Sequence, residues 1–197
     1  MKSYDEAGLI ERLSLMGRSS KVAFAAACAQ RVLPLYIRFY GDGANPNAES
    51  LAKILESVWG AAEGKTTALD GMAEVAESLV PPDDDKWPTD PAYAQSAAAS
   101  VAYAASVWQS NDPGDAELAA RQVYDVADFA AWTLSPIVGS VPPGAANSIE
   151  RQLVVQLALD GIEKDLAAAE DANGSEGWSG LRKQALEEGE AWCKTLP

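Results

Sequence analysis

Apolar residues recur along this chain at intervals of three and four, which is the period of an α-helix. Alternation of β-branched residues, which indicates strands, is absent, and alanine, the best helix former, is abundant. The pattern therefore predicts an all-α bundle of about seven or eight helices. The helices are expected over residues 5–16, 20 or 21 to 40, 47–62, 67–79, 93–109, 115–134, 147–171 and 177–194.

The second predicted helix is apolar on nearly all sides, so we place it at the centre of the fold. Ser19 and Ser20 are its N-cap candidates, and Gly41 begins its stop signal. Pro34 is expected to kink this helix or to end its first half. Because no repeat of fixed period is present, we expect a single helical domain over residues 1–197 rather than a solenoid.

The charged residues and the absence of histidine exclude several classes of site and partner. The chain has 15 Lys and Arg against 29 Asp and Glu, for a net charge of −14, and it has no histidine. The missing histidine excludes Ser-His-Asp and Cys-His nucleophile systems and the common zinc sites. The acidic balance argues against nucleic acid or an anionic membrane as a partner, because both are bound through Lys and Arg.

The charge is also unevenly distributed. Residues 1–40 carry a net charge of +3, so the remainder of the chain carries −17. No apolar run approaches the roughly 18 residues of a membrane span, and the first residues do not resemble a signal peptide. We therefore expect a cytoplasmic protein, with Cys28 and Cys193 as reduced core thiols; a disulfide between them is possible in principle but not indicated.

An acidic run lies in the proline-rich loop near the middle of the chain. Asp83, Asp84 and Asp85 are consecutive, and Trp87 follows them. Three interpretations are open: a solvated loop or N-cap, a protein-contact patch in which Trp87 anchors a partner, or a cation site. Consecutive carboxylates rarely surround a cation, so no metal site and no cofactor are predicted here.

Two further polar sets lie on predicted helices. Asp125 and Asp128 are three residues apart and share one side of their helix, where they suit acid/base work or simply pair with Arg121. Gln152 and Gln156 belong to a polar stripe on the next helix, which either lines a cleft or faces water. No catalytic residue is assigned, and these four residues are candidates for partner binding.

Arg31 and Arg38 lie two turns apart on the otherwise apolar second helix. A buried arginine needs an acidic partner, so we expect a structural ion pair in preference to an anion site. Asp128 and Glu150 are the candidate partners.

The same helix carries Phe24, Cys28, Ala29, Arg31, Pro34, Tyr36 and Phe39, and the next helix carries Ile54, Leu55 and Trp59. This set of positions resembles the signature of the YjaG-like family, which is domain of unknown function 416. The helix around Gln156 and the loop at Asp83 to Asp85 are similar as well, whereas the alanine-rich fifth helix and the Pro142 to Gly144 segment depart from the pattern. The resemblance implies an all-helical cytoplasmic fold and transfers no catalytic residue.

Two classes of function follow from these features. The first is a non-enzymatic acidic binding protein, such as an immunity protein that neutralises a bacterial toxin by blocking its basic surface. The alternative is a carboxylate-based, Mg-dependent enzyme or a small-ligand-binding protein with a cleft between helices. The absence of any nucleophile–base set favours the first class.

Overall fold

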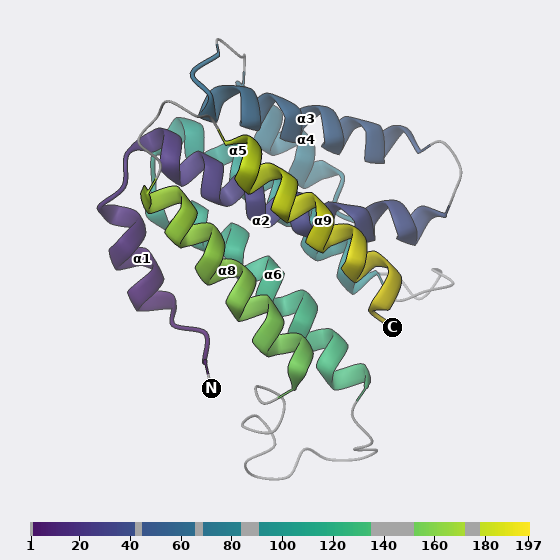
Figure 1. Cartoon of the computed structure of the whole chain (residues 1–197). Helices are drawn as coiled ribbons and strands as arrows, with labels where there is room; N and C mark the ends of the chain where they lie inside the picture. The colour runs from purple at the N-terminus through teal and green to yellow at the C-terminus, as the bar shows by residue number, and fades with distance from the viewer. Residues whose placement is uncertain (1, 42–44, 66–68, 84–90, 135–151, 172–177) are drawn as a thin grey trace.

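The computed structural model describes residues 2–41, 45–65, 69–83, 91–134, 152–171 and 178–197 (Figure 1). Within these ranges it contains eight α-helices and no strand, which confirms the predicted all-α bundle. They are α1 (Glu6–Ser14), α2 (Arg18–Tyr40), α3 (Pro46–Ala62), α4 (Met72–Ser78), α5 (Ala92–Ser110), α6 (Pro113–Thr133), α8 (Leu153–Asp171) and α9 (Ser179–Thr195).

Short polar side chains begin several of these helices, as local capping chemistry requires. Asp5 accepts a hydrogen bond from the backbone N–H of Gly8 at the start of α1. Asn45 caps α3 and Asp112 caps α6, in each case just before a proline at the first helical position. The N-cap of α2 is Gly17, so the prediction of a serine cap for that helix was wrong.

Helix α2 lies at the centre of the bundle, as its all-round apolar pattern predicts. It packs most extensively against α5 and also contacts α3, α6, α8 and α9. Pro34 does not end it, because the helix continues to Tyr40 and stops at Gly41, whose φ is 81°. The missing N–H of a proline costs helix stability, and the burial of α2 by neighbours on every side offsets that cost.

By length and composition α2 is also the one helix in the described ranges that is apolar enough to cross a membrane. However, 72% of its most apolar window is buried inside the bundle, which is typical of a core helix. Cys28 lies in this buried part, and burial raises the pKa of its thiol. Cys193 on α9 is half-buried, and both cysteines are free thiols.

Candidate functional site

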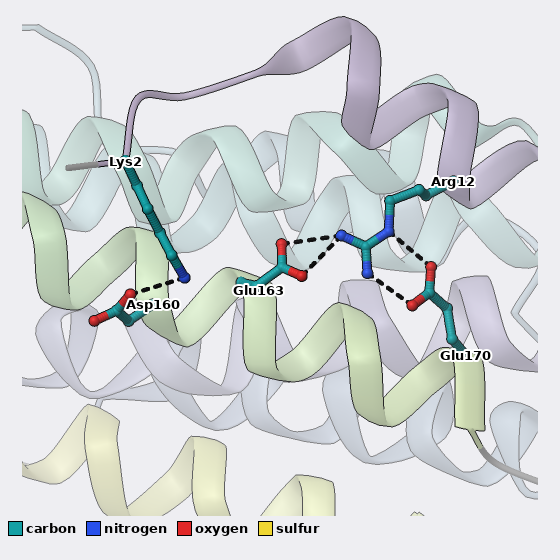
Figure 2. Close-up of polar contacts among 5 residues, drawn as sticks. All are labelled: Lys2, Arg12, Asp160, Glu163 and Glu170. Carbon is teal, nitrogen blue, oxygen red and sulfur yellow. Dashed lines mark hydrogen bonds and ion pairs between the residues drawn. The ribbon is translucent and has the colours of Figure 1, made fainter.

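The polar stripe of α8 contacts the N-terminal segment of the chain. The side-chain amide of Gln156 accepts from the Lys2 backbone N–H at 2.9 Å and donates to the Lys2 carbonyl at 2.8 Å. The Lys2 Nζ atom lies 2.8 Å from Asp160 Oδ1 (Figure 2). Gln152 is half-buried, and its carbonyl accepts the backbone N–H of Gln156. Gln156 and Asp160 therefore bind the chain's own N-terminal segment.

Arg12 of α1 continues this set of contacts along α8. Its guanidinium reaches between two carboxylates, with Nη1 2.9 Å from Glu163 and Nη2 2.7 Å from Glu170 (Figure 2). The hydrogen bond from Arg12 lowers the pKa of Glu170 below its ordinary value, and that from Lys2 does the same for Asp160. Much of the negative charge of α8 is thus balanced within the molecule.

The α6 carboxylates, which were considered for acid/base work, are placed next to Arg121. Its Nε lies 3.2 Å from Asp125 Oδ1, and its Nη1 is 3.7 Å from Glu6. Burial raises the pKa of both Asp125 and Asp128, while Arg121 opposes that shift. Among the described residues, no group of three His, Cys, Asp or Glu side chains has an arrangement that can hold a metal ion.

A second polar contact on α6 was not anticipated from the sequence. The Tyr4 hydroxyl donates to Glu117 Oε1 at 2.6 Å, and Glu117 is almost fully buried. The Tyr4 and Tyr124 ring centroids are 4.9 Å apart with the planes tilted by 39°, and the Arg121 guanidinium carbon lies 5.2 Å from the Tyr4 centroid. Burial raises the pKa of Glu117. The sequence contains no local signal for this contact, because Tyr4 and Glu117 are 113 residues apart and only helix packing brings them together.

Arg31 is fully buried where α2, α8 and α9 meet. Its guanidinium binds both oxygens of Asp165 on α8, which is equally buried, and Glu188 on α9 at 2.8 Å. These two carboxylates take the place of the expected partner Asp128, and Glu150 lies outside the described residues. Burial acts to lower the pKa of Arg31, but the charge and hydrogen bonds of Asp165 act in the opposite direction, and on balance the pKa of Arg31 is raised. Burial also raises the pKa of Asp165. The cluster holds three helices together in the core.

Arg38 has a different environment from the expected ion pair. Its Nη1 donates to the carbonyls of Cys193 and Leu196, at 3.1 and 2.8 Å, and its Nη2 donates to the Pro197 oxygen at 3.2 Å. No side-chain carboxylate in the described part of the chain pairs with it. Arg38 is half-buried and binds the end of α9 to α2.

Exposed carboxylates that form no ion pair with a described residue are found around α4. Asp70, Glu74, Glu77 and Asp83, which we call the α4 acidic segment, are all exposed. None of them forms an ion pair with another described residue, and described residues 69–83 and 91–120 contain no Lys or Arg. The Asp70 carboxylate has one long hydrogen bond, 3.4 Å, from Gln109. Asp84, Asp85 and Trp87 lie outside the described residues.

Comparison with solved structures identifies the fold. No family model matches the chain, and a search of curated proteins found no match. A solved structure does match: the crystal structure, at 1.91 Å resolution, of a DUF416 family protein from Shewanella baltica OS155. The match has a TM-score of 0.76 and 20% sequence identity, and covers 92% of this chain and 94% of that chain. This chain has the DUF416 fold. The resemblance seen in the sequence is therefore confirmed at the level of the fold, which by itself assigns no reaction.

Proposed function

We propose that this chain is a non-enzymatic acidic binding protein whose partner is a protein with a basic surface. The observation that carries the proposal is the α4 acidic segment, whose exposed carboxylates have no cation among the described residues. Uncompensated charge on a surface steers an oppositely charged partner and selects it against others. The carboxylates of α8 differ, because Lys2 and Arg12 already bind them.

The geometry of α4 suits a contact surface. Glu74 and Glu77 are three residues apart and so share one side of the helix. Val75 lies next to them with 49% of its surface exposed, while Ala76 is fully buried and anchors the helix to the core. An apolar side chain within a charged rim is the usual composition of a protein interface.

An immunity protein that blocks the basic groove of a toxin is the specific member of this class that we propose. The alternative, a Mg-dependent carboxylate enzyme, has less support. Its best candidate, Asp125, is engaged by Arg121, and the second candidate, Asp128, faces no third ligand among the described residues.

The test is co-expression with the product of the neighbouring open reading frame, scored by co-purification and by rescue of growth. The double substitution Glu74→Lys with Glu77→Lys reverses two charges of the α4 acidic segment. It should lower the association rate by about tenfold or more at low salt and abolish rescue. The control, Glu187→Lys with Glu190→Lys, changes the net charge by the same amount on α9. It should leave both the association rate and the rescue of growth unchanged.

A neighbouring product that is harmless and never binds would contradict the immunity proposal. Equal losses in the two double variants would contradict the assignment to α4, because they would show that only net charge matters.

A further inference from the structure

A hollow of about 530 Å³ lies where α2, α5 and α6 meet, beside the end of α9. This volume is within the range of small-molecule sites, roughly 300–1,000 Å³. The hollow is separate from the α4 acidic segment, so any ligand it takes is a function beyond the one proposed above. Its described lining comprises Leu35, Arg38 and Phe39 of α2, Tyr93 of α5, Phe129 and Thr133 of α6, and Pro197, which follows α9.

The walls of this hollow are mainly apolar and include a packed pair of aromatic rings. The rings of Tyr93 and Phe129 meet edge to face, with centroids 5.2 Å apart and planes at 85°. The side chain of Leu35 is almost completely buried behind them. Aromatic walls with fixed mutual geometry offer a preformed surface to the apolar part of a ligand, which avoids the entropy cost of ordering the site.

Arg38 is the one charged residue of the described lining. Its guanidinium carbon lies 5.4 Å from the Tyr93 ring centroid, and backbone oxygens of Cys193, Leu196 and Pro197 hold its Nη atoms in place. The Nε–H makes no hydrogen bond within the described part of the chain. A fixed arginine with an available donor, at the wall of an apolar hollow, suits one anionic head group.

We infer that this hollow binds an organic anion with an apolar body, namely a carboxylate attached to an alkyl chain or ring. The carboxylate binds Arg38, and the apolar body packs between Phe39, Tyr93 and Phe129. The overall charge of −14 repels anions, so the local cation and the apolar walls must together provide the affinity.

Three eight-carbon probes separate the contributions of charge and apolar contact, and isothermal titration calorimetry of the whole chain measures their binding. Octanoate should bind at least about tenfold more tightly than 1-octanol, which has the same chain without the charge, because Arg38 adds a charge-assisted hydrogen bond. Octyltrimethylammonium, which carries the opposite charge, should bind more weakly than either. Equal affinities for octanoate and 1-octanol would overturn the inference without any substitution.

Variants then locate the site. Arg38→Gln should reduce the affinity for octanoate to that for 1-octanol. Arg182→Gln, which removes one cation from α9, should change the affinity for neither probe. Thr133→Trp fills the hollow from the α6 side and should abolish binding of both probes. Octanoate affinity that stays at the wild-type level in Arg38→Gln, or octanoate binding that survives Thr133→Trp, in a protein with the wild-type circular dichroism spectrum would place the anion elsewhere and overturn the inference.

Discussion

At Arg31, the charge cluster of the core and a close approach of two helices occur at the same residue. The guanidinium is paired with Asp165 and Glu188, while the Arg31 backbone touches Gly189 of α9. A Cβ on Gly189 would lie 2.5 Å from the Arg31 carbonyl oxygen and 3.1 Å from its Cα. Both are backbone atoms, which move only if α2 and α9 separate.

We therefore predict that Gly189→Ala lowers the free energy of unfolding by about 1–3 kcal/mol, the usual cost of overpacking a core. Urea denaturation followed by circular dichroism measures the effect. Gly180→Ala on the same helix is the matched control, because nothing lies within 4 Å of the added Cβ. It should be neutral or stabilising by up to about 1 kcal/mol. Equal effects at the two positions would show that helix propensity, and not the α2–α9 approach, decides the outcome.

Removing the cation tests the pairing itself. Arg31→Met leaves Asp165 buried without its main counter-ion and should cost about 3–5 kcal/mol at pH 7. Burial raises the pKa of Asp165 in the folded protein, so protonation removes the buried charge more readily there than in the unfolded chain. The difference in unfolding free energy between the wild type and Arg31→Met should therefore be smaller when urea unfolding is repeated at pH 5. A deficit that is the same at both pH values would mean that lost packing, and not a stranded carboxylate, is responsible.

At the scale of elements, α1 is attached to the bundle differently from the other helices. Leu9 and Leu13 are its buried residues, and it lies beside a hollow of about 440 Å³ toward α8. Its contacts to α8 are largely polar. Arg12 pairs with two carboxylates of α8, and Lys2, just before α1, pairs with a third (Figure 2). Side chains in these ion pairs are one-third to one-half exposed, so salt screens them.

We predict that α1 opens separately from the rest of the bundle. Arg12→Gln, or about 1 M salt on the wild type, should reduce the hydrogen-exchange protection of α1 amides by up to about tenfold and leave α2 unchanged. Arg12 lowers the pKa of Glu170, so the stabilising contribution of this contact is full above the ordinary glutamate pKa of about 4.3 and is lost as the pH falls through the lower pKa of the folded protein. Lys183→Gln is the control, since Lys183 belongs to an exposed pair within α9. Loss of protection in α1 and α2 together would show one cooperative unit.

Helix positions were predictable because their causes are local. Gly41 ends α2 as expected, and Asn45 and Asp112 cap α3 and α6 through neighbouring backbone groups. The partners of Arg31 were not predictable, since Asp165 is 134 residues away in the chain and only helix packing brings it near. The same holds for Gln156 and Lys2, which are 154 residues apart. An apolar helix indicates that its arginine is buried, but not which carboxylate it meets.

At the scale of the whole molecule, the sequence locates the charges along the chain and the structure shows which of the described charges form ion pairs. The positive N-terminal region folds back onto acidic α8 through Lys2 and Arg12, so these opposite charges are balanced within the chain. The α4 acidic segment has no such cation among the described residues. Acidity in general favours solubility, whereas acidity that remains unbalanced at one place favours a partner.

The most direct measurement is an NMR titration of the isotope-labelled protein with a short lysine-rich peptide at low salt. We predict that amide shift changes concentrate on residues 69–83 and disappear in the Glu74→Lys, Glu77→Lys variant, because four exposed carboxylates of that surface form no ion pair with a described residue. Raising the salt concentration should reverse them. Shift changes centred on α8 or α9, or spread evenly over the surface, would contradict the assignment of the binding surface to α4.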